Sequence, residues 1–273
     1  MSDRDARIEE LARKKVVYRI PGMDAATIRQ DEPYRTTSNG ALLMDIYYPA
    51  ERQTGERLPV VVIVMGYPDP QGFCRKLGWA VSWAQLIAAS GMAAVIFGNQ
   101  EPTADVHFAL QHIRQNAASL GIDEKRIGVA ACSGNVAVAL SALMQDAGLK
   151  CAALLYGYTL DLYAATGVAD MARLYGFDNA CAGKSVDDLP SDVPLFLVRA
   201  GRDQFTGLND ALDLFLATAL ARNLPVTLVN HANGPHAFDL DDDSETSREI
   251  VKQILAFMQF HLQVTTSSLF AGR

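Results

Sequence analysis

The stretch RIGVAACSGNVA, residues 126–137, decides the fold of this chain. It begins with a largely apolar run typical of a buried strand, reaches Ser133 at the end of that run, and continues directly into an apolar helical pattern. This order predicts a strand, a tight turn and a helix, with the serine hydroxyl on the turn near the helix N-terminus. A serine there serves either as a nucleophile or only as a helix N-cap, and the motif alone leaves both roles open.

The turn departs from the usual G-x-S-x-G pattern of a nucleophile elbow. It reads Ala131-Cys132-Ser133-Gly134-Asn135, so both outer glycines are replaced. Alanine is small enough for the close approach of strand and helix, and asparagine tolerates unusual backbone angles better than other non-glycine residues, so we expect the turn to form. Cys132 is expected to pack against the sheet, because adjacent side chains at a strand end face opposite ways.

Strand and helix patterns alternate along most of the chain. From residue 58 onward, short apolar runs rich in Val, Ile, Leu and Ala are separated by longer helical patterns, which is typical of a parallel sheet with crossover helices. The predicted strands are 59–65, 92–97, 126–132, 150–156, 194–200 and 225–230, and the predicted helices are 78–90, 103–120, 134–147, 209–223 and 244–261. The fold class is therefore α/β, with an open sheet wound on both faces and ligand sites beyond the carboxyl ends of its strands.

Two regions differ from this rhythm. Before residue 50, the runs 16–18 and 42–48 predict antiparallel strands, with turn residues at 38–40. The long segment 157–192 is expected to form a small cap with helices of its own, or else a surface excursion, within a single domain spanning 1–273. Four residues are expected to bound helices, Thr103 and Ser244 as N-caps and Gly121 and Gly148 as C-terminal stops.

Composition limits the class of protein. The 273 residues are 49% hydrophobic and 20% charged, which is ordinary for a globular protein and excludes a disordered or fibrous one. The net charge of −7 and the pI near 5.2 repel phosphate backbones and anionic lipid, so nucleic acid and membranes are not expected partners. The N-terminal residues 1–15 are charged throughout, without the apolar stretch of a secretory signal, which predicts a cytoplasmic protein.

The cysteines give no sign of a metal or redox site. They stand far apart without a CxxC pair, so buried free thiols are expected in preference to disulfides, at Cys74, Cys132, Cys151 and Cys181. No GxGxxG, P-loop or HExxH pattern occurs, so no cofactor is implied.

Two further segments place chemistry-bearing residues after strands. VPLFLVRAGRD, residues 193–203, runs from a buried strand into a glycine and an acid, and LVNHANGPHAFD, residues 228–239, follows a strand with a Gly-Pro loop. Each signal alone is weak. Together they give the chain order Ser133, Asp203, His236, with each residue after a strand of one parallel sheet, which is the order of a Ser-Asp-His triad in one of its known arrangements.

These motifs together resemble an α/β-hydrolase of the dienelactone hydrolase or esterase type. The likeness rests on RIGVAACSGN (126–135), VRAGRD (198–203), GPHAF (234–238) and LLMDIYYP (42–49), and it extends from residue 42 to about residue 261. Dienelactone hydrolases carry a cysteine nucleophile, whereas Ser133 stands at the matching position here. The resemblance therefore implies an esterase or a related acyl hydrolase.

The roles that follow are those of a serine hydrolase. Ser133 would attack an acyl carbon, His236 would take its proton, and Asp203 would orient the imidazole. The oxyanion needs two donors, and we expect the backbone N–H groups of Gly134 and of Tyr67, the latter in the loop MGYPDP after a predicted strand. The substrate would be a small carboxylic ester or lactone. The alternatives are a thioesterase, a peptidase, a cofactor-free haloperoxidase or a non-catalytic ligand-binding protein of the same fold.

Several other polar residues are expected to be structural. His231 follows its strand directly and lacks the Gly-Pro presentation, so His236 is preferred as the base. His107 and His112 lie on a predicted helix and are expected to be surface or packing residues. The acidic run at positions 239 and 241–243 is expected to be solvated near the start of the last helix. Six aromatic residues are expected either to line an apolar cleft or simply to pack: Tyr67, Phe73, Trp79, Tyr156, Tyr158 and Phe205.

Overall fold

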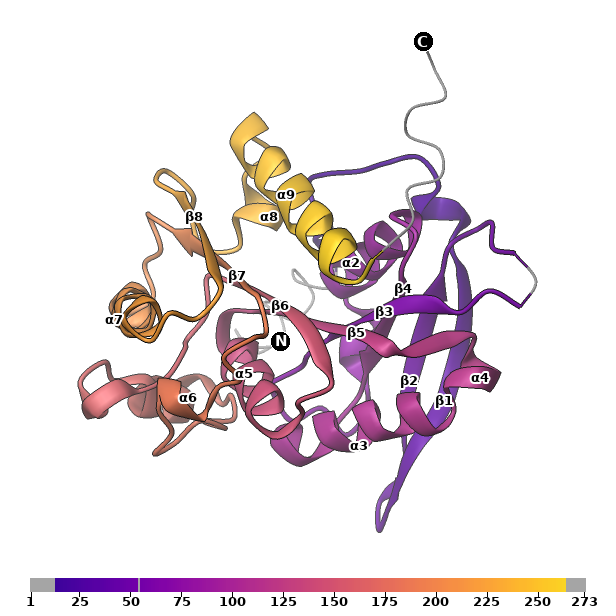
Figure 1. The fold of residues 1–273 in the computed structure, drawn as a ribbon, viewed down its shortest axis with the longest axis horizontal. Coiled ribbons are helices and arrows are strands. Elements are labelled where there is room, and N and C mark those ends of the chain that lie inside the picture. The colour runs from indigo at the N-terminus through magenta and orange to yellow at the C-terminus, as the bar shows by residue number, and fades with distance from the viewer. Residues whose placement is uncertain (1–12, 54, 264–273) are drawn as a thin grey trace, which may run out of the picture.

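A computed structural model describes residues 13–53 and 55–263 and shows a central sheet with helices on both sides (Figure 1). The described residues form eight strands in the order β1-β2-β4-β3-β5-β6-β7-β8. Their bounds are β1 Thr27–Thr37, β2 Gly40–Tyr48, β3 Leu58–Ile63, β4 Ala93–Phe97, β5 Ile122–Cys132, β6 Leu149–Leu155, β7 Leu195–Ala200 and β8 Val226–His231. β2 pairs antiparallel with β1 and β4, and every other pair is parallel. The α/β fold class with antiparallel N-terminal strands is confirmed.

The helices cover both faces of the sheet (Figure 1). Their bounds are α2 Gly78–Ala89, α3 Pro102–Gln115, α4 Ala117–Leu120, α5 Val136–Gln145, α6 Val168–Tyr175, α7 Leu208–Ala221, α8 Phe238–Asp241 and α9 Glu245–His261. Side chains of α3, α5 and α7 form one apolar core, and those of α2 and α9 form the other. In β3, Val60 and Val62 join the first core while Val61 and Ile63 join the second, so the strand is apolar throughout because it is buried on both faces.

The prediction of a strand at residues 16–18 is wrong. The backbone N–H of Val16 donates to the Ser82 hydroxyl, and that of Val17 donates to the Asp239 carbonyl, so these donors bind α2 and α8 instead of a neighbouring strand. The antiparallel partner of β2 is β1, and the predicted turn at residues 38–40 does join these two strands.

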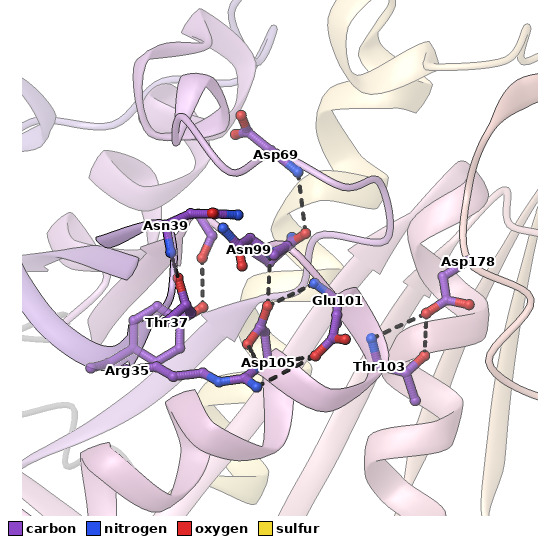
Figure 2. A network of polar contacts seen from close by, with 12 residues as sticks. Arg35, Thr37, Asn39, Asp69, Asn99, Glu101, Thr103, Asp105 and Asp178 are labelled. Carbon is purple, nitrogen blue, oxygen red and sulfur yellow. Dashed lines mark hydrogen bonds and ion pairs between the residues drawn. The ribbon is translucent and has the colours of Figure 1, made fainter. Parts of the chain in front are cut away.

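The helix boundaries follow local hydrogen bonds. The predicted helix 103–120 is two helices, α3 and α4, and Thr103 is not an N-cap. Pro102 occupies the first turn, where its missing N–H is harmless, and the Asp105 carboxylate accepts the backbone N–H groups of Gln100 and Glu101 (Figure 2). The Asp105 side chain, from the first turns of α3, therefore binds the two residues that precede the helix.

The other expected helix ends are confirmed with one exception. The Ser244 hydroxyl accepts the N–H of Ser247 at the start of α9, and Gly121 ends α4 with φ of 64°. Gly148 does not end α5, because the helix stops at Gln145 and Asp146 is the C-cap. The Asp146 carboxylate accepts the Gly148 N–H at 2.9 Å, which closes a turn directly after the helix.

The segment 157–192 contains short helices of its own. They are the 3₁₀ turn η4 Leu162–Ala164, the helix α6 and the 3₁₀ turn η5 Val186–Asp188, drawn in pink and orange in Figure 1. No helix within the described part of the chain combines the length and the apolar character needed to span a bilayer. Most of the N-terminal stretch used to predict cellular location, residues 1–12, lies outside the described residues.

Candidate active site

The turn after β5 has the strained backbone of a nucleophile elbow. Ser133 adopts φ of 55°, which is unusual for a residue with a side chain, and it begins the 3₁₀ turn η3 Ser133–Asn135 that leads into α5. Its carbonyl accepts the backbone N–H of Tyr158 at 3.2 Å. The predicted strand–turn–helix arrangement is therefore present, and it turns the Ser133 hydroxyl toward an imidazole.

Asn135 serves the turn in a way that differs from the prediction. Its φ and ψ are −78° and −18°, which are ordinary helical angles, so its tolerance for unusual angles is not used. Its side-chain oxygen instead accepts the backbone N–H of Gly66 at 2.7 Å, in a buried position. A Cβ on Gly66 would lie 2.8 Å from the Cα of Asn135, so only glycine allows this close approach.

The three residues predicted to form a triad lie together at the ends of β5, β7 and β8. The Nε2 of His236 is 2.9 Å from the Oγ of Ser133, and its Nδ1 is 2.6 Å from the Oδ2 of Asp203. The Asp203 side chain is fully buried, and its other oxygen accepts the backbone N–H of Phe205 at 3.0 Å. With Asp203 accepting from Nδ1–H, the lone pair of Nε2 faces the serine hydroxyl, which is the arrangement a general base requires.

Two aromatic rings hold the imidazole of His236 in place. The Tyr156 ring meets it edge-on with centroids 4.8 Å apart, and the Phe205 ring lies tilted against it at 4.4 Å. Tyr156 has φ of 35° and Ala237, the residue after the histidine, has φ of 58°. These backbone angles, one directly after β6 and one at the N-cap of α8, are not apparent from residue type, so the sequence did not reveal them.

Asp239 contradicts the prediction of a solvated acidic run. Asp239 is 1% exposed, and its carboxylate accepts hydrogen bonds from the Tyr156 hydroxyl at 2.5 Å and from the indole N–H of Trp83 at 2.7 Å. Burial raises the pKa of this carboxyl above its usual value. The sequence did not reveal that Asp239 binds Tyr156, the ring that supports His236, because nothing in the run 239–243 distinguishes Asp239 from the other acidic residues.

His231 forms its side-chain hydrogen bonds with Asp242 and Ser247. Its Nε2 is 3.1 Å from a carboxylate oxygen of Asp242 and 3.0 Å from the Ser247 hydroxyl, so it joins β8 to the start of α9. Burial acts to raise the pKa of Asp242, but hydrogen bonds from Ser247, Ser244 and His231 hold it below its usual value. The preference for His236 over His231 as the residue facing the serine agrees with this geometry.

His107 and His112 lie on α3, where the sequence predicts a helix. His112 contacts Glu32 at 3.2 Å, and burial lowers the pKa of the partly buried His107. All four cysteines are free thiols, and burial raises the pKa of Cys132 to about 12, so its thiol stays protonated beside the nucleophile. Within residues 13–53 and 55–263, no cluster of three His, Cys, Asp or Glu residues is arranged to hold a metal ion.

The loop after β3 brings Tyr67 to the nucleophile turn. A Cβ on Gly134 would lie 2.5 Å from the Tyr67 hydroxyl oxygen and 2.8 Å from the ring of Phe177. The atom of Tyr67 closest to Gly134 is thus the end of its side chain. The two residues expected to supply oxyanion donors are therefore neighbours in space.

A polar network fixes this loop to the sheet and to the segment 157–192 (Figure 2). The buried Asn99, directly after β4, bonds to Asp69 through both backbone and side chain, and its amide donates to the Met65 carbonyl at 3.3 Å. On the other side, the Asp178 carboxylate accepts the backbone N–H and the hydroxyl of Thr103. The ends of β3 and β4, the start of α3 and the 157–192 segment are thereby tied together around the site.

Solved esterases share the architecture of this chain. The esterase Est2 of Thermogutta terrifontis matches with a TM-score of 0.69 at 18% identity, covering 95% of this chain and 100% of that chain. A hyperthermophilic esterase from the archaeon Pyrobaculum calidifontis gives 0.66 at 19% identity, over 94% and 88% of the two chains. Esterase B from Lactobacillus Rhamnosis gives 0.70 at 17% identity, over 95% and 92%. No protein-family model and no curated protein sequence matches this chain.

The chain has the α/β-hydrolase fold, as its own topology and these solved structures show together. The predicted α/β-hydrolase fold is confirmed. The narrower likeness to dienelactone hydrolases stays a prediction.

Proposed function

We propose that this protein is a serine hydrolase that cleaves carboxylic esters through an acyl-enzyme intermediate. Ser133 is the nucleophile, His236 the general base and Asp203 the carboxylate that orients the imidazole. The observation that carries the proposal is the position of His236, which bridges Ser133 Oγ at 2.9 Å and Asp203 Oδ2 at 2.6 Å. A serine that only caps a helix does not need an imidazole at its hydroxyl, so the geometry favours the catalytic role of Ser133 over the capping role.

The reaction follows from these contacts. Ser133 Oγ attacks the acyl carbon while its proton passes to Nε2 of His236, and the imidazolium that forms is stabilised by Asp203. His236 then protonates the departing alcohol. Water repeats the sequence on the acyl-enzyme and releases the acid. The negative charge that develops on the acyl oxygen is stabilised by the backbone N–H of Gly134 and by Tyr67 in the loop after β3.

The surroundings favour an uncharged, small-molecule ester. Aromatic rings of Phe177 and Phe205 lie against Gly134 and His236, and apolar walls of this kind are typical of ligand pockets. The Thermogutta terrifontis esterase 2 is described as phosphonylated by sarin and as bound to propionate or butyrate, which is consistent with short acyl groups in this fold. Lactones, thioesters and peptides are the alternative acyl substrates.

We also propose that residues 1–273 are one domain in which the segment 157–192 caps the site. Phe177 of this segment lies within contact distance of Gly134, and the backbone N–H of Tyr158 donates to the Ser133 carbonyl. These contacts favour a cap in preference to a surface excursion. The acidic net charge of −7 favours a small-molecule substrate in preference to nucleic acid or a membrane. We also propose that the protein is cytoplasmic.

The experiment that tests the function is ester hydrolysis by Ser133→Ala. With p-nitrophenyl esters of graded chain length, the variant is expected to lose roughly 10⁴- to 10⁶-fold in kcat while remaining folded by circular dichroism. A fluorophosphonate probe mapped by mass spectrometry is expected on Ser133 of the wild-type protein. Turnover by Ser133→Ala near the wild-type value, or labelling of Cys132 instead, would refute the assignment.

A further inference from the structure

The side chain of Tyr67 reaches the residue that follows the nucleophile. Its hydroxyl oxygen is the heavy atom nearest to where a Cβ would stand on Gly134, at 2.5 Å, and a side chain larger than hydrogen at that position would displace it. The Cα of Gly134 is bonded directly to the amide nitrogen whose N–H takes part in the proposed mechanism. The Tyr67 hydroxyl therefore lies close to the Gly134 Cα, which carries that nitrogen.

Packing keeps the ring of Tyr67 in this position. It meets the Phe177 ring edge-on, with centroids 6.1 Å apart and an interplanar angle of 70°. Phe177 in turn stacks on Tyr158 at 5.2 Å, and the Tyr158 hydroxyl donates to the carbonyl of Thr206 at 3.0 Å. Although Tyr67 is 37% exposed as a residue, its aromatic end is thus supported by two further rings.

The backbone before Tyr67 is held independently of its side chain. The Gly66 N–H donates to the Asn135 side chain at 2.7 Å, and the Gly66 carbonyl accepts the Asp178 N–H at 2.8 Å. The described residues contain no cis peptide bond, so the N–H of Tyr67 points opposite to the Gly66 carbonyl. The bond from the Asp178 N–H fixes the plane of the Gly66–Tyr67 peptide, so removing the Tyr67 hydroxyl leaves the direction of the Tyr67 N–H unchanged.

We propose that the phenolic O–H of Tyr67, and not its backbone N–H, is the second oxyanion donor beside the N–H of Gly134. This inference rests on the proposed function and names the group that completes its site. As Ser133 Oγ bonds to the acyl carbon, the π pair of the carbonyl moves onto oxygen, and the Tyr67 O–H and Gly134 N–H donate to it. When the bond to the leaving alkoxide breaks, that pair re-forms the carbonyl and His236 gives its proton to the alkoxide. Phenolic hydroxyls keep their proton at neutral pH, so the donor is always present.

The test is Tyr67→Phe, which removes one oxygen and retains the ring and the fixed N–H. We expect kcat for a p-nitrophenyl ester to fall roughly 10²- to 10³-fold, with KM within about threefold of wild type. Tyr163→Phe is the matched control, because that tyrosine is 82% exposed in η4, and it is expected to keep wild-type kcat. A Tyr67→Phe variant with wild-type kcat would assign the second hydrogen bond to the backbone and overturn the inference.

A second measurement separates a catalytic hydroxyl from a structural one. A trifluoromethyl ketone, which adds Ser133 to form a stable oxyanion, is expected to bind Tyr67→Phe more weakly by the same factor as the loss in kcat/KM. Inhibition by the product acid is expected to change little. A loss of kcat/KM with unchanged ketone affinity overturns the inference. Absence of both ester turnover and Ser133 labelling in the wild-type protein refutes the proposed function itself, whereas an active wild type with a fully active Tyr67→Phe refutes only the role of the hydroxyl.

Discussion

Replacing Asp239 by Ala is expected to lower the free energy of unfolding by about 3 kcal/mol. The carboxylate accepts the Tyr156 hydroxyl at 2.5 Å and the Trp83 indole N–H at 2.7 Å. Asp239, Tyr156 and Trp83 are 1%, 2% and 8% exposed, so water cannot replace the lost acceptor without opening the structure. The substitution leaves two buried donors without a partner.

The magnitude follows from two opposing contributions. Each buried donor left unpaired costs about 1–3 kcal/mol, which gives about 2–6 kcal/mol for the pair. Burial of the carboxylate is itself unfavourable, as its raised pKa indicates, so its removal offsets part of that loss. A net loss of about 3 kcal/mol is large beside a total stability of about 5–15 kcal/mol.

Urea unfolding followed by far-ultraviolet circular dichroism measures this difference. Asp243→Ala is the matched control from the same acidic run, because the Asp243 side chain is 65% exposed and pairs with Arg248 at the surface. Its expected cost is below about 0.5 kcal/mol. If Asp239→Ala costs no more than Asp243→Ala, the buried network contributes nothing net and the reasoning from burial is wrong.

The pH dependence of Asp239→Asn gives an independent check. Burial raises the folded-state pKa above the unfolded value, so the stabilising contribution of this carboxyl is fully present below the unfolded pKa and is lost as the pH rises through the folded pKa. The stability advantage of wild type over Asp239→Asn, a permanently neutral variant, should therefore shrink as the pH rises from below about 3.8. An advantage that grows with pH would mean that the ionised carboxylate is net stabilising.

Three shorter predictions concern the site. His236→Ala is expected to lose roughly 10⁴-fold or more in kcat. His231→Ala is expected to keep kcat within about threefold and to lower the melting temperature. The opposite ranking of the two kcat values would identify His231 as the base. Asn135→Ala leaves the Gly66 N–H without its acceptor and is expected to lower kcat roughly tenfold or more with little change in KM. Asn135→Asp retains an acceptor oxygen and should recover part of the lost kcat. Equal losses of kcat in the two variants would contradict this role. Iodoacetamide at about pH 8 should leave Cys132 unmodified until the protein is unfolded, because burial holds its pKa near 12, and rapid alkylation of the native protein would argue against that burial.

The main features of the sheet could be read from the sequence, because they depend on neighbours along the chain. The run 194–200 is apolar at every position except Arg199 because a parallel strand inside the sheet is buried on both faces, so β7 could be predicted with almost its observed bounds. The same holds for the three residues after strands, since Ser133, Asp203 and His236 each follow an apolar run that ends in small or turn-forming residues. Parallel strands bring their carboxyl ends to one edge, and that geometry alone brings the three together.

Tertiary structure decided whatever depends on segments distant in the sequence. Asp239 is buried because Tyr156 and Trp83, 83 and 156 positions away, supply its donors, whereas Asp243 of the same run pairs with Arg248 at the surface. Asn135 is selected by a hydrogen bond to Gly66 and not by its own backbone angles. The Tyr67 hydroxyl reaches Gly134 only because the loop after β3 is tied down on both sides. A sequence pattern records which residues prefer to be buried, but the partner that makes a buried polar group stable is set by the packing of the whole chain.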